Sequence, residues 1–251
     1  MGIAKNHVYA VLAAVLLIAA YVAWSIGWPP ALEFHERAFP QGFRELVLGG
    51  AATRLDPSFG LQPLPRAGPA AKPSLREVCD ALYRDPGDPA LGDRESPVQI
   101  VEFFDYRCPY CKTLANILAA VRDERMRIVY KEWPILGASS VLAARAALAA
   151  DRQGKYHAFH MRLMNSRFIP TAKLIEDMAA ELGMNPAQLG SDMQSSAVTR
   201  VIECTSALAS ALGFFGTPVL VVGRTVAQCD IARPKLERLI EVERQAQRKA
   251  C

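Results

Sequence analysis

The sequence has few of the residues that build structural metal sites and nucleic-acid interfaces. It contains four histidines and six cysteines, and only Cys108 and Cys111 form a closely spaced pair. A structural zinc site normally needs a second close pair of ligands, so its absence argues against zinc. The 29 basic and 25 acidic residues are mixed along the chain without a basic stripe, which argues against nucleic-acid binding. We therefore expect no metal, no organic cofactor and no nucleic-acid partner.

Cys108 and Cys111 lie where an apolar strand is followed by a helix. The sequence predicts a buried strand at residues 98–104 and a helix at residues 108–122. The N–H groups and the dipole at a helix start stabilise a thiolate, and Pro109 suits the first helical position, where no N–H is needed. The pattern predicts a redox dithiol in which Cys108 attacks and Cys111 resolves. A zinc half-site and an inert disulfide are the weaker alternatives.

An uncharged apolar run extends from residue 8 to residue 26 near the N-terminus. As a helix it would be about 28 Å long, close to the hydrocarbon thickness of a bilayer. A cleaved signal peptide is the alternative, but its core is shorter and the residue at −3 is small, whereas Tyr21 stands there. We expect an uncleaved signal anchor over residues 1–28. Because an oxidised dithiol needs an oxidising compartment, the anchor would lie in a bacterial inner membrane with the catalytic domain in the periplasm.

Two further regions follow the predicted anchor. Residues 29–73 are rich in proline and glycine, which predicts a linker; an ordered docking or oligomerising role for residues 34–48 is the alternative. The globular domain is expected over residues 74–251, and its strands and helices alternate. After the first strand and helix, the sequence predicts a strand at 127–133, a helical block over about 138–212, strands at 219–222 and 225–228, and a helix at 234–247. This order predicts an α/β sheet with a helical insertion.

Thr217 and Pro218 directly precede one of the predicted strands. A trans proline in an ordinary turn fits this position, and so does a cis Thr217–Pro218 bond that faces the dithiol. The cis arrangement would leave the backbone of Thr217 available to pair with a bound peptide strand. The residue pattern alone leaves both possibilities open.

Glu102 and Lys131 are charged residues within otherwise apolar strands. Burying a charge is expensive unless it is paired or used chemically. If both side chains lie under Cys111, they can exchange protons with that thiol during disulfide exchange. The alternative is that both reach solvent at strand ends.

The motifs resemble those of a known family. Residues 103–111 (FFDYRCPYC) resemble the active-site signature of DsbA-like thioredoxin-fold proteins, and residues 131–137 (KEWPILG) with 139–147 (SSVLAARAA) are similar to the ScsC-like branch. The resemblance covers about residues 91–245. It implies a thioredoxin fold with a helical insertion, preceded here by the transmembrane helix and linker. It also implies the following roles: Cys108 as nucleophile, Cys111 as resolving thiol, a cis Pro218, substrate contacts from Tyr110 and Thr217, and Glu102 and Lys131 as the buried acid and lysine.

Two features depart from the family pattern. Tyr110 stands where DsbA has a histidine, which predicts a weaker thiolate and a less oxidising disulfide, and Thr217 is more like the isomerase relatives. Residues 228–230 (QCD) replace an apolar-Pro-Gly turn. Some DsbA relatives carry a second disulfide in this region, so a Cys204–Cys229 bridge is expected, with two buried free thiols as the alternative. Cys79 and Cys251 have no assigned role; they could pair with each other.

The expected function is a membrane-tethered periplasmic thiol–disulfide oxidoreductase. It would form or isomerise disulfides in unfolded or partly folded secreted proteins, with a membrane redox partner of the DsbB or DsbD type, as a monomer. The alternatives are a dedicated periplasmic thiol reductant and a non-catalytic metal-binding or chaperone-like module. The direction of electron flow stays open, because hydrogen bonds to the sulfur set the reduction potential.

Overall fold

The structure is a computed structural model that describes residues 14–18, 31–49, 53–54 and 73–246. Residues 14–18 are helical, and most of the predicted anchor lies outside the described residues. No helix within the described part of the chain is long and apolar enough to cross a bilayer. The described residues from Leu32 onward form one compact unit.

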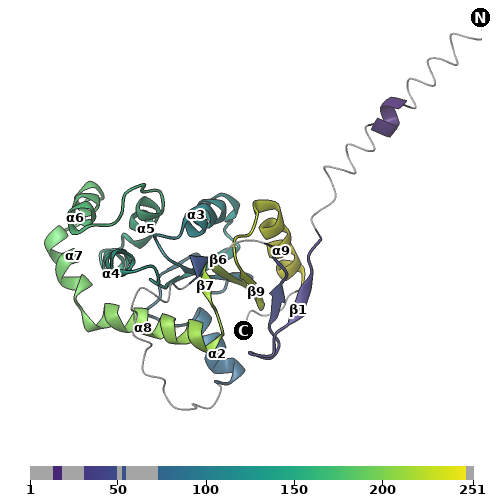
Figure 1. The fold of residues 1–251 in the computed structure, drawn as a ribbon, viewed down its shortest axis with the longest axis horizontal. Helices are drawn as coiled ribbons and strands as arrows, with labels where there is room; N and C mark the ends of the chain where they lie inside the picture. Colours follow the sequence, from purple (N-terminus) through teal and green to yellow (C-terminus); the bar gives the residue numbers. More distant parts are fainter. Residues whose placement is uncertain (1–13, 19–30, 50–52, 55–72, 247–251) are drawn as a thin grey trace, which may run out of the picture. The chain divides into compact units, whose positions relative to one another are not determined.

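A seven-stranded mixed sheet lies at the centre of this unit (Figure 1). The strand order is β1-β2-β9-β8-β5-β6-β4, with β1 (Phe34–Glu36), β2 (Arg44–Leu46), β4 (Ala90–Leu91), β5 (Val98–Phe104), β6 (Met126–Glu132), β8 (Val219–Val222) and β9 (Thr225–Gln228). The central strands β5 and β6 are parallel, and β8 runs antiparallel to β5. A separate two-stranded sheet joins β3 (Thr53–Arg54) to β7 (Gly216–Thr217).

Helices cover both faces of the large sheet (Figure 1). Side chains alternate along β5: Ile100 and Phe104 belong to the core under α3 (Pro109–Val121) and α9 (Arg233–Gln245), whereas Val101 and Phe103 belong to the core that includes residues of α2 and α8. The remaining helical bounds are α2 (Leu75–Tyr83), α4 (Ala138–Asp151), α5 (Tyr156–Met164), α6 (Ala172–Glu181), α7 (Pro186–Met193) and α8 (Ser196–Ala211). The helices from α4 to α8 confirm the predicted insertion between the two halves of a thioredoxin-like sheet.

Local sequence signals explain several boundaries. Ser74 caps α2: its hydroxyl accepts a hydrogen bond from the Glu77 N–H at 3.2 Å, and the Glu77 carboxylate accepts one from the Ser74 N–H at 2.7 Å. This reciprocal pair satisfies two backbone donors that a helix start leaves unpaired. The strands predicted at residues 219–222 and 225–228 have those bounds in the structure.

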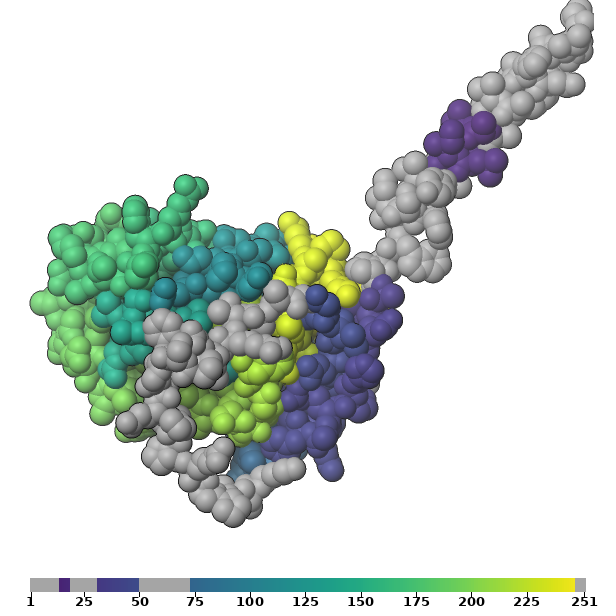
Figure 2. Space-filling model, in the orientation of Figure 1, coloured from purple at the N-terminus to yellow at the C-terminus, as the bar shows by residue number. Residues whose placement is uncertain are grey.

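The hairpin of β1 and β2 corrects the prediction that residues 29–73 form a linker throughout. β2 pairs in parallel with β9, and the adjacent Phe43 is buried at 1% exposure. Arg44 donates to the Thr225 hydroxyl at 2.7 Å and forms an ion pair with Glu243 at 2.5 Å. Three-residue strands are too short to show the alternation typical of a strand in the sequence. The high proline content therefore predicts a linker in this region. In Figure 2 the hairpin, in purple, lies beside the C-terminal elements in yellow and green.

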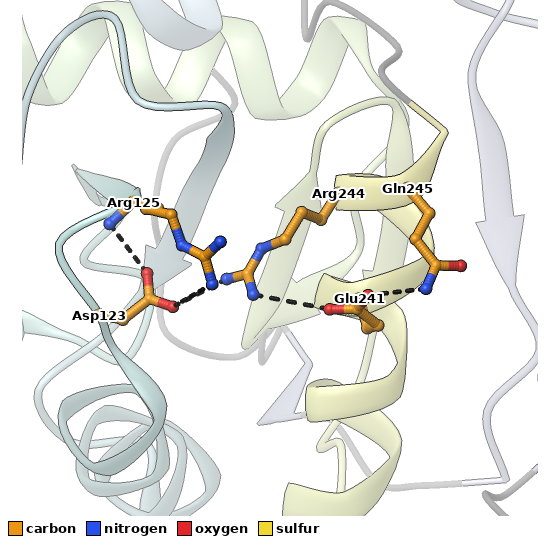
Figure 3. Close-up of polar contacts among 5 residues, drawn as sticks. All are labelled: Asp123, Arg125, Glu241, Arg244 and Gln245. Atoms are coloured by element: carbon orange, nitrogen blue, oxygen red, sulfur yellow. Dashed lines mark hydrogen bonds and ion pairs between the residues drawn. The ribbon is translucent and has the colours of Figure 1, made fainter.

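An ion pair joins α9 to the loop that follows α3 (Figure 3). Arg244 Nη2 lies 2.9 Å from Asp123 Oδ2, and Arg244 Nη1 lies 3.5 Å from Glu241 on its own helix. Asp123 Oδ1 also accepts the Arg125 N–H at 2.9 Å. Partly exposed pairs of this kind contribute up to about 1 kcal/mol, and these pairs connect the end of α9 with the residues just before β6.

Candidate active site

Cys108 is the N-cap residue of α3 and is fully buried. Its backbone is extended, and its Sγ accepts a hydrogen bond from the Cys111 N–H at 3.4 Å. Pro109 occupies the first turn of the helix. The structure confirms the predicted placement of the first cysteine at a helix start, where the free N–H groups and the helix dipole favour a thiolate.

The sulfur of Cys108 also contacts the strand that precedes the proline motif. The Thr217–Pro218 peptide bond is cis, as the family resemblance implied. Cys108 Sγ donates a hydrogen bond to the carbonyl oxygen of Thr217 at 3.4 Å. The backbone of β7 therefore lies next to the sulfur, and such a strand edge can pair with the extended backbone of another polypeptide.

Cys111 lies in the first turn of α3 and is buried on the same side of the sheet as Glu102. Burial, the hydrogen bond with Cys108 and the charge of Cys108 raise the pKa of Cys111 well above its ordinary value. Both carboxylate oxygens of Glu102 are buried and have no hydrogen-bond partner among the described residues. Burial above all, and then the charge of Cys108, raise the pKa of Glu102 to about 8. A carboxyl that titrates near neutral pH can exchange a proton with the resolving thiol.

A small internal cavity connects Glu102 with the surface. Its volume is about 90 Å³, and Tyr130, His157 and His160 contribute to its lining. This volume is sufficient for water. Burial lowers the pKa of His160 to about 3, and partial desolvation together with the charge of Arg122 lowers the pKa of the more exposed His157. Because exposed residues such as His157 also line it, the cavity extends from buried Glu102 toward the protein surface.

Lys131 does not lie with Glu102, so the prediction that both point under Cys111 is wrong. Glu102 is in register with Tyr130, and because side chains alternate along a strand, Lys131 points to the opposite face of the sheet. Lys131 Nζ forms a buried ion pair with Asp88 and donates to a backbone carbonyl of α2 at 2.6 Å. Burial raises the pKa of Asp88 to about 6 although Lys131 opposes the shift. The lysine is a structural partner on the α2 side of the sheet.

Sequence reasoning misses a second buried carboxylate, Glu132, on the same face as Glu102. Its Oε1 accepts hydrogen bonds from the hydroxyls of Tyr106 and Tyr156, each at 2.8 Å. Burial raises the pKa of Glu132 well above its ordinary value, although both hydrogen bonds oppose the shift. Tyr130 lies opposite Glu102 in the pairing of β5 with β6, and Glu132 follows Tyr130 by two residues. Because side chains alternate along a strand, Glu132 points to the same face of the sheet as Glu102, and this spacing is the signal that the sequence offers.

Asp105 organises the loop that carries the dithiol, and sequence reasoning gives it no role. Its Oδ1 accepts hydrogen bonds from the Arg107 N–H and the Ser140 hydroxyl, both at 2.7 Å. Its Oδ2 accepts those of the Ile135 and Leu136 N–H groups at 2.8 and 2.9 Å. One carboxylate thus joins the turn before α3 to the start of the helical insertion. The hydrogen bond from the N–H of Arg107, two residues after Asp105, closes an Asx turn, which aspartate commonly forms.

The predicted disulfide between Cys204 and Cys229 is wrong. Cys204 is a free, exposed thiol on α8, whereas Cys229 is half-buried and lines a groove together with Leu212 at the end of that helix. Cys204 lies eight residues before Leu212, or about 12 Å along the helix axis. A disulfide needs Cα atoms within about 7 Å. Cys79 is disulfide-bonded, and Cys251 lies outside the described residues.

Comparisons with known proteins show what the chain resembles. The family described as DSBA-like thioredoxin domain matches residues 99–239. A thioredoxin-like oxidoreductase from Silicibacter pomeroyi is 42% identical, with 66% of this chain and 97% of that chain covered and a TM-score of 0.63. A periplasmic thioredoxin-like protein from Salmonella enterica is 29% identical, with 69% and 99% covered and a TM-score of 0.64. The thiol-disulfide exchange protein alpha-DsbA2 from Wolbachia pipientis is 25% identical, with 66% and 92% covered and a TM-score of 0.63.

Proposed function

The chain belongs to the DsbA-like thioredoxin-domain family of thiol–disulfide oxidoreductases, and we propose that it forms or isomerises disulfides in secreted proteins through Cys108 and Cys111. The observation that carries the proposal is the position of Cys108 Sγ between the start of α3 and the carbonyl oxygen of Thr217. The helix start stabilises a thiolate or a leaving thiolate. The strand edge at Thr217 offers a client backbone a partner beside the sulfur.

The oxidising reaction begins with a disulfide between Cys108 and Cys111. A client thiolate attacks Cys108 Sγ, the Cys108–Cys111 bond breaks, and Cys111 leaves as a thiolate. Because the pKa of Cys111 is raised, this thiolate takes up a proton, and Glu102 is placed to supply it. A second client thiolate then attacks the client sulfur of the mixed disulfide, and Cys108 leaves as a thiolate. The client gains a disulfide, and the enzyme is left as a dithiol.

Isomerisation uses the same groups from the reduced state. The Cys108 thiolate attacks a client disulfide, which releases one client thiolate and forms the mixed disulfide. A different client thiolate then displaces Cys108 and creates a new client pairing. Because Cys108 ends as it began, this cycle needs no external oxidant, whereas the oxidising cycle would be renewed by a membrane redox partner of the DsbB or DsbD type.

Exposed apolar side chains near the dithiol would contact unfolded clients. Phe168 and Ile169 are 72% and 61% exposed in the loop between α5 and α6. This loop is joined to the first turn of α3, since Lys112 Nζ donates to the Ser166 carbonyl at 2.6 Å. Tyr110, next to the resolving thiol, is half-buried and packs against the core. A strand edge binds the backbone of a client, and neighbouring apolar side chains bind its apolar residues. Neither contact depends on a particular sequence, so such a site can accept many different clients.

A membrane tether and a periplasmic location are part of the proposal. The uncharged run at residues 8–26 supports the tether. The Salmonella enterica relative described as periplasmic supports the location. Both fit the requirement of a working disulfide for an oxidising compartment.

Refolding of a disulfide-containing client tests the proposal. The full-length chain, in mild detergent, would be added in its oxidised form to reduced unfolded ribonuclease and in its reduced form to scrambled ribonuclease. We expect a return of ribonuclease activity in at least one of the two assays, and none with Cys108→Ala. Reduction of insulin disulfides without either refolding activity would contradict the proposal and favour the dedicated reductant.

A further inference from the structure

The strand edge beside Cys108 already carries a strand of the same chain. β3 pairs with β7 in antiparallel register, with Thr53 opposite Thr217 and Arg54 opposite Gly216. This pair forms its own two-stranded sheet, separate from the seven-stranded one. Thr217 is the residue whose carbonyl accepts the hydrogen bond from Cys108 Sγ.

We propose that β3 is an internal occupant of the client-binding edge, which an unfolded client must displace before it reaches Cys108. The inference rests on the proposed function in one respect, because it takes β7 as the edge on which clients pair. It adds that the N-terminal segment regulates access to the dithiol.

The occupant cannot itself react with the dithiol. The first cysteine of the chain is Cys79, so the 78 residues before it, which include β3, contain no thiol. β3 therefore resembles a client in backbone pairing but lacks the thiol or disulfide that exchange requires. The complete burial of Cys108 agrees with a nucleophile that is covered when β3 is paired.

β3 is short, so its pairing with β7 can be reversed, and its attachment to β2 keeps it close to β7. A two-residue strand forms few backbone hydrogen bonds, so the pairing is weak and a client strand can replace it. β2 ends at Leu46 on the large sheet, and Thr53 follows seven residues later. Seven residues span at most about 25 Å, which keeps β3 at a high local concentration near β7. The apparent affinity for a client is then the intrinsic affinity reduced by the fraction of molecules whose edge is open.

Proline substitutions in β3 test the proposal in the full-length chain. In Thr53→Pro/Arg54→Pro, proline removes the backbone N–H groups that a paired strand can donate. The matched control is Thr53→Val/Arg54→Val, which keeps both N–H groups and a strand-forming side chain. Two rates are measured: alkylation of Cys108 by iodoacetamide, read by peptide mass spectrometry with exposed Cys204 as internal standard, and disulfide exchange with an unfolded cysteine-containing peptide.

We expect Cys108 to be alkylated about tenfold faster in the proline variant, the effect of losing one or two backbone hydrogen bonds, with Cys204 unchanged. We also expect the KM for the peptide to fall by a similar factor at constant kcat, and the valine control to match the wild type. Equal alkylation rates in all three proteins would overturn the inference even if exchange is active. Faster alkylation without exchange in any of them would uphold the occupancy and refute the oxidoreductase cycle instead.

Discussion

Cys108 Sγ and the Thr217 carbonyl oxygen are 3.4 Å apart, although 109 positions separate the two residues in the chain. The contact brings the start of α3 against the strand that precedes the cis proline. One sulfur is thereby placed at a helix start, which favours its ionisation, and at a strand edge, which can hold a client. The predictions below depend on this arrangement and on the buried groups beneath it.

Glu102→Gln should slow the attack of a client thiolate on the Cys108–Cys111 disulfide, because glutamine cannot donate a proton to the departing Cys111 thiolate. We expect a loss of at least about tenfold in the rate of oxidation of a client peptide, measured by stopped-flow fluorescence. In the wild type the oxidation rate should fall above pH 8, where Glu102, with a pKa of about 8, loses its proton. A rate in Glu102→Gln that equals the wild-type rate across this range would show that another group protonates Cys111.

The same substitution should change how stability depends on pH. The pKa of Glu102 is raised in the folded state, so between its ordinary value and about 8 the folded chain holds a proton that the unfolded chain has lost. The free energy of unfolding of the wild type therefore decreases as the pH rises through this range. The decrease attributable to Glu102 should be roughly 3–5 kcal/mol, and urea unfolding of Glu102→Gln at pH 5 and pH 8 should lack it. Parallel losses in both proteins would contradict the assignment.

Lys131→Met should reduce stability without affecting exchange. The substitution leaves Asp88 buried without its cation, which costs about 3 kcal/mol when the carboxylate is ionised. Urea unfolding at pH 8, where Asp88 of the wild type is ionised because its pKa beside Lys131 is about 6, measures this loss, and Lys131→Met/Asp88→Leu should recover much of it. A pH-dependent defect in client oxidation would instead show that Lys131 takes part in proton transfer to Cys111.

Phe168→Ser should weaken client binding. The exposed ring lies in the loop held to α3 by Lys112, so its removal should raise the KM for an unfolded peptide several-fold and leave exchange with glutathione unchanged. Leu75→Ser is the matched control, because Leu75 is also an exposed apolar residue, at 39%, but begins α2. Equal KM values for the two variants would count against a client surface at Phe168.

The features that the sequence predicts correctly are those with strong local signals. The helix start at Cys108 follows from the strand, the dithiol and Pro109, and the capping box at Ser74 follows from its spacing to Glu77. The insertion follows from a long stretch of helical periodicity. These signals are contained within a few turns of chain, so they hold without knowledge of tertiary contacts.

The features that the sequence does not predict depend on register and on distant pairing. Glu102 and Lys131 are both charged residues in apolar strands, and only the pairing of β5 with β6 shows that they face opposite sides. β3 has two residues and its partner lies more than 160 positions away, which no local pattern records. The distance between Cys204 and Cys229 depends likewise on where α8 ends relative to β9.

Trapping of the mixed disulfide tests whether Cys108 is the nucleophile. The full-length Cys111→Ala variant, in reduced form, would be mixed with an unfolded client that carries one disulfide, and the products separated on a non-reducing gel and mapped by mass spectrometry. We expect a covalent complex through Cys108 that lasts longer than the wild-type complex, because Cys111 can no longer attack the mixed disulfide, and no complex with Cys108→Ala. A complex that forms through Cys204 or another cysteine, or equally well without Cys108, would contradict the assignment of Cys108 as the nucleophile.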